Sequence, residues 1–142
     1  ALRKQLVDLP DGGVYIQTIP KAPYRCPPGP YERVSQIAHY FKTQKPNSKI
    51  IVLDANDQII SKGKLFKGVW DSEYKDLIEY RPNWNVTEIN AETNIVTSEI
   101  GDRERGDEAQ HQCARARAHP RTRSRRRWPA SSAPMRSSTP GT

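Results

Sequence analysis

The sequence PYRCPPGPYERVSQIAHYF, residues 23–41, joins a loop that contains a cysteine to an amphipathic helix. Four apolar residues follow the i, i+3, i+4, i+7 spacing of a buried helical face: Val34, Ile37, Ala38 and Phe41. Pro30 has a fixed φ that suits a first helical position. The sequence therefore predicts a helix that begins near Pro30.

Cys26 and Glu32 are the two residues of this stretch that suggest chemistry. Cys26 lies just before the predicted helix, where unpaired backbone N–H groups and the helix dipole favour a negative charge such as a thiolate. Glu32 lies in the first turn, where an acid commonly does no more than complement the dipole. A lone cysteine in an α/β domain is also more often inert than reactive. The residues alone leave both a reactive and a structural role open.

The segments on either side predict a βαβ unit. Residues 13–19 have the pattern of a strand, and residues 49–53, KIIVL, form an apolar run typical of a parallel strand covered on both faces. Asp54 ends this strand about where a Rossmann fold places the acid that binds a ribose hydroxyl. The glycine-rich phosphate turn is missing, because residues 26–30, CPPGP, include prolines that lack N–H groups. We therefore expect a closed nucleotide pocket that binds no NAD(P).

The remaining pattern completes an α/β fold. Residues 1–11 predict a short helix, and a helical turn around residues 70–74 leads to a short strand at residues 78–80. Residues 86–89 and 94–100 alternate weakly and predict a β-hairpin. The predicted fold class is α/β: an incomplete Rossmann-like βαβ domain with a β-hairpin, followed by a disordered tail.

Residues 103–142 differ from the rest of the chain in composition. They contain 10 Arg against 3 acidic residues, whereas residues 1–102 hold 13 Lys+Arg against 13 Asp+Glu, so the net charge of +7 comes from this segment. It contains no Leu, Ile, Val, Phe or Tyr. Because such a segment cannot bury enough apolar surface to offset its ordering entropy, we predict a disordered tail over residues 103–142.

Two explanations of this tail remain. A natural basic arm would bind nucleic acid or an acidic partner through charge. Alternatively, the tail is a shifted reading frame, because GC-rich codons read out of phase give Arg, Ala, Pro and Ser; we favour this explanation. The neutral charge of residues 1–102, and arginines with only Trp128 as an aromatic neighbour, disfavour nucleic-acid binding.

Several segments together resemble one protein family. They are ALRKQL at residues 1–6, YRCPPGPYERVSQIAHYFK at 24–42, KPNSKIIVLDAND at 45–57 and KLFKGVW at 64–70. They resemble the middle of the flavoprotein subunit of flavocytochrome c sulfide dehydrogenase, which is related to the sulfide:quinone oxidoreductases and the pyridine nucleotide-disulfide oxidoreductases. The resemblance covers roughly residues 1–102 and is specific, because CPPGPYER joins an unusual loop to a helix start.

This resemblance implies catalytic roles for Cys26 and Glu32. In the family, the cysteine of this motif is one half of a redox-active disulfide beside FAD, and the glutamate lies in the site that oxidises sulfide. Electrons then pass through FAD to a cytochrome c subunit in the periplasm. The resemblance also implies that the NAD(P)H pocket is blocked.

By the same resemblance, residues 1–102 form part of the second nucleotide-binding-like domain of an FAD-dependent oxidoreductase. The FAD turn, the partner cysteine and an export signal are then expected outside this sequence, since Cys113 falls in the tail. We therefore expect an internal fragment that holds no FAD and is inactive alone. The sequence identifies no cofactor-binding residue and no metal site, because Cys113, His111 and His119 lack ligand spacing, and it has no apolar run of membrane-spanning length.

Overall fold

The structure is a computed structural model that describes residues 2–111. Within this range ten elements follow one another along the chain: α1 (Leu2–Asp8), β1 (Val14–Ile19), α2 (Gly29–Gln44), β2 (Lys49–Asp54), α3 (Gly63–Glu73), β3 (Ile78–Arg81), β4 (Val86–Asn90), β5 (Ile95–Ser98), β6 (Arg103–Arg105) and β7 (Glu108–His111). The predicted short first helix, the helix near Pro30 and both strands of the βαβ unit are confirmed.

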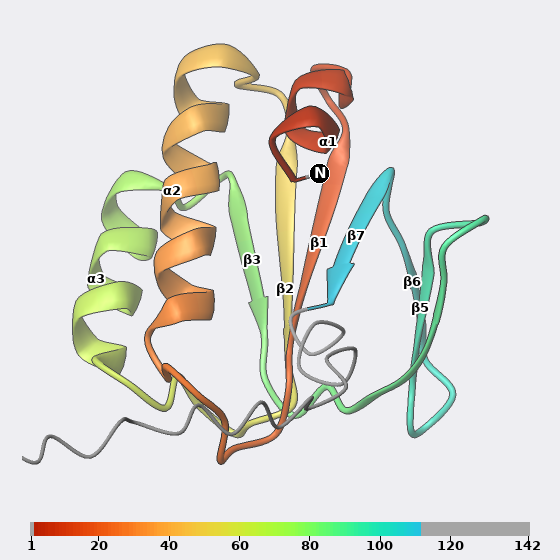
Figure 1. The fold of residues 1–142 in the computed structure, drawn as a ribbon. Helices are drawn as coiled ribbons and strands as arrows, with labels where there is room; N and C mark the ends of the chain where they lie inside the picture. The colour runs from red at the N-terminus through yellow and green to blue at the C-terminus, as the bar shows by residue number, and fades with distance from the viewer. Residues whose placement is uncertain (1, 112–142) are drawn as a thin grey trace, which may run out of the picture.

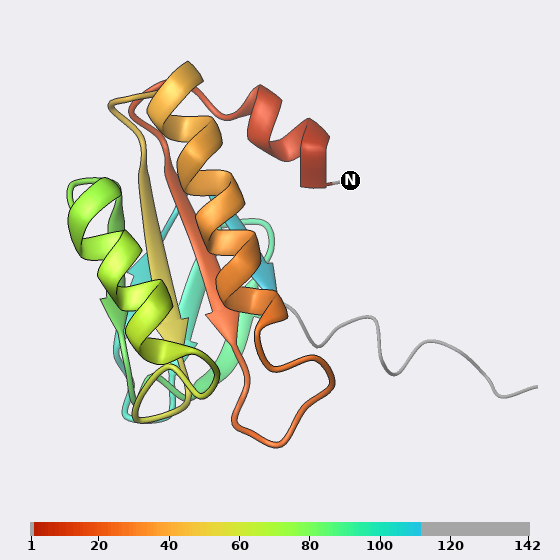
Figure 2. The same cartoon turned by 90° about the vertical axis from the view of Figure 1, so that its left-hand side faces the viewer.

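Four parallel strands form the main sheet, in the order β3-β2-β1-β7. β1 and β2 pair from Val14 opposite Lys49 to Ile19 opposite Asp54, so their carboxyl ends meet at one edge of the sheet. Within this sheet, β3, β2 and β1 follow the strand order of one half of a Rossmann fold, and the parallel sheet with its helices confirms the predicted α/β class. Figures 1 and 2 show that α2 and α3 lie side by side over one face of this sheet.

A second, antiparallel sheet of β4, β5 and β6 lies against the opposite face (Figure 2). Ile16, Ile51 and Leu53 of the main sheet pack there with Val96 of β5, and all four are buried. Both faces of β2 are therefore covered, which explains the continuous apolar run in its sequence. The predicted hairpin is confirmed as β4 and β5, and β6 adds a third strand that the sequence did not indicate.

The larger core lies between the main sheet and the two helices. The helical face predicted from the sequence is buried at all four positions: Val34, Ile37, Ala38 and Phe41. These side chains belong to one cluster with Ile50 and Val52 of β2. Removing the ring of a buried phenylalanine such as Phe41 costs about 3–5 kcal/mol. This packing fixes α2 on the sheet and thereby places the loop that precedes it.

Helix α3 is longer than the helical turn that the sequence predicted around residues 70–74. Its buried residues are only Phe66 and Trp70, which lie one turn apart. Two glycines, Gly63 and Gly68, lower its helix propensity, so the local signal was weak. The ring of Tyr31 in α2 packs against Phe66 and Trp70 at centroid distances of 5.8 and 6.3 Å. Tertiary contacts therefore stabilise a helix that the local sequence specifies poorly.

The fold also extends beyond Asp102, where the sequence placed the start of a disordered tail. β6 and β7 both follow this residue, and β7 pairs in parallel with β1. Asp107 fixes the start of β7, because its carboxylate accepts a hydrogen bond from Val14 N–H at 2.7 Å and its N–H donates to the Val14 carbonyl at 2.8 Å. An edge strand pairs through backbone groups and does not need the apolar side chains whose absence suggested disorder. The prediction for residues 112–142 lies outside the described residues.

Helix α1 is attached to the rest of the fold by Lys45, which follows α2. The Nζ of Lys45 donates hydrogen bonds to the carbonyls of Leu6 and Val7, at 2.7 and 2.8 Å, and to that of Leu9. A cation is favourable at this end of a helix, because the last carbonyls have no partner within it. No helix within residues 2–111 is long and apolar enough to cross a membrane.

Candidate functional site

Residues 20–28, here called the Cys26 loop, connect β1 to α2. The carbonyl of Cys26 accepts a hydrogen bond from Gly29 N–H at 3.0 Å, which closes a tight turn into the helix. Cys26 itself has a φ of 58°, in the left-handed region, which costs a residue other than glycine about 1–2 kcal/mol. Its side chain is exposed and is a free thiol. The Cys26 loop therefore presents the sulfur to solvent at the start of α2.

Glu32 lies in the first turn of α2, and its side chain is exposed. Cys26 and Glu32 thus occupy the same end of α2, at the carboxyl edge of the main sheet. Among the described residues, no hydrogen bond or ion pair joins the two side chains. The structure brings the two predicted residues to one corner of the fold but does not couple them directly.

The start of α2 offers fewer free amides than the sequence suggested. Gly29 N–H donates to the Cys26 carbonyl, Glu32 N–H donates to the Pro28 carbonyl at 3.0 Å, and Pro30 has no N–H. Pro28 occupies the N-cap position without a side-chain hydrogen bond. The effect of the helix on an anion at Cys26 therefore comes mainly from the dipole of the whole helix.

Asp54, at the carboxyl end of β2, is fully buried. Its Oδ2 accepts hydrogen bonds from the hydroxyls of Tyr31, at 2.8 Å, and Tyr80, at 3.0 Å. Its Oδ1 accepts two more from Asn56, from the N–H at 2.9 Å and from Nδ2 at 2.7 Å. The acid that would meet a ribose in a nucleotide-binding unit is here satisfied from within the protein.

Both tyrosines act as hydrogen-bond donors to this carboxylate. Burial, together with the hydrogen bond to Asp54, raises the pKa of the Tyr31 hydroxyl well above its usual range. Burial and the negative charge of Asp54 raise the pKa of Tyr80 in the same direction. Both shifts favour the protonated phenols, which donate to the Asp54 carboxylate.

Asn56 connects the same carboxylate to the start of the Cys26 loop. Its Nδ2 also donates to the Pro20 carbonyl at 3.0 Å, and its Oδ1 accepts from Ala22 N–H at 2.9 Å. Asn56 is 2% exposed, so its side chain lies inside the protein, while the loop residues that it holds are partly accessible. Sequence patterns do not indicate that Asn56 or Tyr80 belongs to the site, because a turn asparagine and a strand tyrosine are ordinary at those positions.

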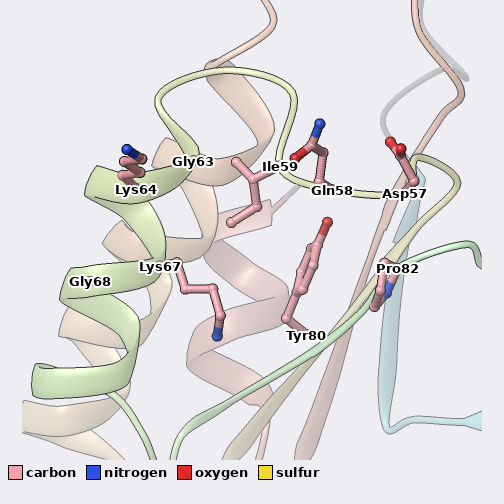
Figure 3. A pocket seen from close by; sticks show the side chains of 9 residues that line it. All are labelled: Asp57, Gln58, Ile59, Gly63, Lys64, Lys67, Gly68, Tyr80 and Pro82. Atoms are coloured by element: carbon pink, nitrogen blue, oxygen red, sulfur yellow. The ribbon is translucent and has the colours of Figure 1, made fainter.

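A groove of about 700 Å³ lies beside this network, between α3 and the ends of β2 and β3 (Figure 3). It is lined by Asp57, Gln58, Ile59, Gly63, Lys64, Lys67, Gly68, Tyr80 and Pro82. Lys64 and Lys67 are exposed, and Lys67 pairs with Asp71 at 3.0 Å. The lysines are thus surface groups, as their sequence pattern indicates, and do not form a preorganised anion site.

The residues of the βαβ unit do not fit a dinucleotide. The turn from β1 to α2 contains Pro27, Pro28 and Pro30, which supply no N–H groups, and its one glycine amide is already bonded to Cys26. The pyrophosphate of FAD or NAD(P) requires such free amides at this turn. Among the described residues, no group of three or more His, Cys, Asp or Glu side chains is arranged to hold a metal ion.

Comparison with known families identifies a match over most of the chain. The model of the sulfide dehydrogenase (flavocytochrome c) flavoprotein chain, central region, matches residues 1–110. The match includes Cys26, Glu32 and Asp54, and it continues past Asp102 to the last strand of the main sheet.

Among solved structures, a chain of the Tetrahymena thermophila mitochondrial ATP synthase, in a cryo-EM structure of the F1Fo composite tetramer, is similar in fold. The TM-score is 0.50 at 15% sequence identity. The similarity covers 76% of this chain and 28% of that chain. At this level of identity the similarity concerns the fold alone.

Proposed function

This chain belongs to the family of the flavocytochrome c sulfide dehydrogenase flavoprotein chain, to which it corresponds in the central region, and we propose that it supplies the Cys26 loop of a sulfide-oxidising site. The observation that supports this proposal is the exposed, free thiol of Cys26 at the start of α2. A sulfur in that position can be reached from solvent by a small anion, and the positive end of the helix dipole attracts such an anion.

The proposed reaction begins with a disulfide between Cys26 and a second cysteine of the complete flavoprotein. Hydrosulfide attacks one sulfur of this disulfide, so a new S–S bond forms and the old one breaks. One cysteine becomes a persulfide and the other leaves as a thiolate. The sulfide sulfur is oxidised and the disulfide is reduced, so the step is balanced without a further reagent.

We assign Glu32 the role of proton acceptor in this step. Hydrogen sulfide is a weak nucleophile until it loses a proton, and a carboxylate at the same end of α2 can accept that proton directly or through one water. The competing role of Glu32 is that of an acid that complements the helix dipole. The two roles differ in their pH dependence, which the last prediction below uses.

The activity itself requires the complete flavoprotein. FAD would be held outside the βαβ unit described above, because the turn from β1 to α2 does not fit a dinucleotide. We propose that the electrons pass to a cytochrome c subunit in the periplasm, and that this chain alone is inactive. The family name supports the flavoprotein and flavocytochrome parts of this proposal.

The experiment replaces Cys26 with Ser in the complete flavoprotein and measures sulfide-dependent reduction of cytochrome c. We expect turnover to be lost, because the sulfur that forms the disulfide is gone, while the bound flavin still accepts electrons from dithionite. Ser35→Ala, at a partly buried position in the same helix, is the control and should keep turnover. Sulfide oxidation that survives Cys26→Ser would overturn the proposal.

A further inference from the structure

Asp54 is connected to the segments on both sides of the Cys26 loop. It bonds directly to Tyr31, which follows the loop, and through Asn56 to the residues that begin the loop. Tyr31 follows the loop in the first turns of α2, and Asn56 holds the residues that begin the loop. The two connections meet on opposite oxygens of one carboxylate, Tyr31 on Oδ2 and Asn56 on Oδ1. A single buried acid thus fixes the distance between the start and the end of the loop.

The connection on the helix side is tightly packed. Tyr31 is fully buried, its ring contacts Phe66 and Trp70, and its hydroxyl also accepts a hydrogen bond from Ile60 N–H at 3.4 Å. Only five positions separate it from Cys26 in the sequence, and the turn hydrogen bond from Gly29 to Cys26 lies between them. A displacement of Tyr31 would therefore move the thiol.

The connection on the strand side uses two hydrogen bonds of Asn56, to the backbone of Pro20 and of Ala22. The side chain of Lys21 adds a bond from its Nζ to the Ala55 carbonyl at 3.2 Å. The first three residues of the Cys26 loop are thus tied to the segment that follows β2. The exposed middle of the loop, which carries Cys26, lies between two fixed ends.

The chemistry of the network requires a carboxylate at residue 54. All four groups that meet it are donors: two phenol hydroxyls, one backbone N–H and one amide NH₂. An ionised carboxylate has acceptor positions for all of them, and hydrogen bonds to an ionised group are about twice as strong as neutral ones. Burial without these donors would be very unfavourable.

We propose that Asp54 is a positioning residue. It holds Cys26 in the orientation in which Glu32 can accept the proton of the hydrogen sulfide that reacts there. Asp54 lies where a nucleotide-binding unit has the acid that contacts a ribose. Here its hydrogen bonds hold the Cys26 loop. This inference rests on the proposed function for the role of Cys26. The anchoring of the loop is a separate claim that can be measured without any sulfide chemistry.

Tyr31 and Tyr80 provide a matched pair of variants for the test. Both hydroxyls donate to the same oxygen of Asp54, and both rings pack against Trp70, at 6.3 and 6.0 Å. Tyr31→Phe removes the bond to Asp54 from α2, next to the loop, and also the hydrogen bonds of this hydroxyl with Ile60 N–H and with Tyr24. Tyr80→Phe removes the bond to Asp54 from β3. Each variant loses one hydroxyl and keeps its ring, and thermal unfolding measures the stability that each one loses.

The first measurement is hydrogen exchange of the full chain, followed by mass spectrometry of peptides that cover residues 20–31. We expect Tyr31→Phe to raise exchange in the Cys26 loop about tenfold or more, beyond what its loss of global stability accounts for, since a hydrogen bond to a buried charged group is lost. Tyr80→Phe should leave exchange in the loop within about twofold of the wild type. Equal exchange in the two variants would overturn the anchoring of the loop by Asp54.

The second measurement follows the reaction at Cys26 in the same full chain. Both cysteines are converted to mixed disulfides with an aromatic thiol, hydrosulfide is added, and the persulfide on the peptide of residues 26–33 is quantified against that on the Cys113 peptide. Hydrosulfide forms the persulfide and displaces the aromatic thiolate, so the reaction is balanced. We expect Tyr31→Phe to slow persulfide formation at Cys26 about tenfold relative to Cys113, and Tyr80→Phe to leave the ratio unchanged.

Glu32→Gln separates positioning from a general loss of stability. At mildly acidic pH, where much of the sulfide is protonated, this substitution should slow the reaction at Cys26 in the wild-type background. In the Tyr31→Phe background it should add little, because the two changes disrupt the same arrangement. Additive effects in this double-mutant cycle would overturn the positioning role. If Glu32→Gln has no effect in the wild type, the proposed base fails, and the exchange measurement still decides whether Asp54 holds the loop.

Discussion

The hydroxyl of Tyr31 donates a hydrogen bond to the buried carboxylate of Asp54 across 2.8 Å, from the first turns of α2 to the end of β2. In a dinucleotide-binding βαβ unit these two places flank the nucleotide, with the pyrophosphate at the helix start and the ribose at the strand end. Here a protein side chain joins them. An acceptor position that a ribose hydroxyl would use is therefore taken by the Tyr31 hydroxyl.

The first prediction is that the full chain carries no flavin after purification and binds no NADH. Asp54 has its acceptor positions filled, and the prolines between Cys26 and Tyr31 offer no amides to a pyrophosphate. Equilibrium dialysis against NADH and an absorption spectrum of the purified chain test this directly. A visible flavin band, or a dissociation constant in the low micromolar range, would contradict it.

The fold was predictable where one periodic pattern dominates a segment. The four apolar residues of α2 and the apolar run of β2 are each specified locally, and both elements form where the sequence places them. Helix α3 and strand β7 were not predictable in this way. α3 depends on the contacts of Phe66 and Trp70 with Tyr31, and β7 depends on backbone bonds to β1. Neither partner is visible from the segment itself.

The residues of the candidate site also differ in how far a local pattern predicts them. Cys26 and Glu32 follow one another closely in an unusual motif, so the sequence alone identifies them as candidates. The network around Asp54 joins Tyr31, Asn56 and Tyr80, and two of these residues are more than twenty positions from the acid. Such pairings arise only when β1, β2 and β3 lie side by side. Local patterns cannot show which tyrosines will meet a buried carboxylate.

The second prediction concerns the segment after Asp102, through a matched pair of glycine substitutions. An alanine at Gly106, between β6 and β7, would place its Cβ 2.8 Å from Ile16 Cγ1 and 3.1 Å from the Val14 carbonyl. Since Ile16 is fully buried, the neighbours can yield little, and we expect Gly106→Ala to cost about 1–3 kcal/mol of unfolding free energy.

The partner variant is Gly68→Ala in α3, where a Cβ meets no atom within 4 Å. This substitution should be neutral or should stabilise the protein by up to about 1 kcal/mol, because alanine has the higher helix propensity. Urea unfolding of the two full-length variants compares them. A Gly106→Ala variant as stable as the wild type would show that residues after Asp102 do not pack on β1 as described.

The third prediction concerns Lys45, whose Nζ bonds the carbonyls at the end of α1. Lys45→Met keeps most of the side-chain length and removes the donors, so we expect a loss of about 1–3 kcal/mol and rapid amide exchange in α1. Lys42→Met, in the last turn of α2, is the matched control. Lys42 forms an exposed ion pair with Glu73, at 2.9 Å, and its loss should change stability little. Protected α1 amides in Lys45→Met would refute the attachment.

The last prediction separates the two roles of Glu32 in the complete flavoprotein. Glu32→Gln keeps the shape of the side chain and removes the base, so turnover with sulfide should fall by roughly 10²–10⁴-fold at mildly acidic pH if Glu32 accepts the proton. The deficit should narrow as pH rises, because more of the sulfide is then already deprotonated and needs no base. An acid that only complements the dipole of α2 would produce a small deficit that does not depend on sulfide ionisation.

Glu73→Gln, which removes another exposed acid far along the chain in α3, is the control and should leave the pH profile unchanged. Equal turnover of Glu32→Gln and the wild type from mildly acidic to mildly alkaline pH would assign Glu32 to the helix dipole and leave Cys26 without a base from this chain.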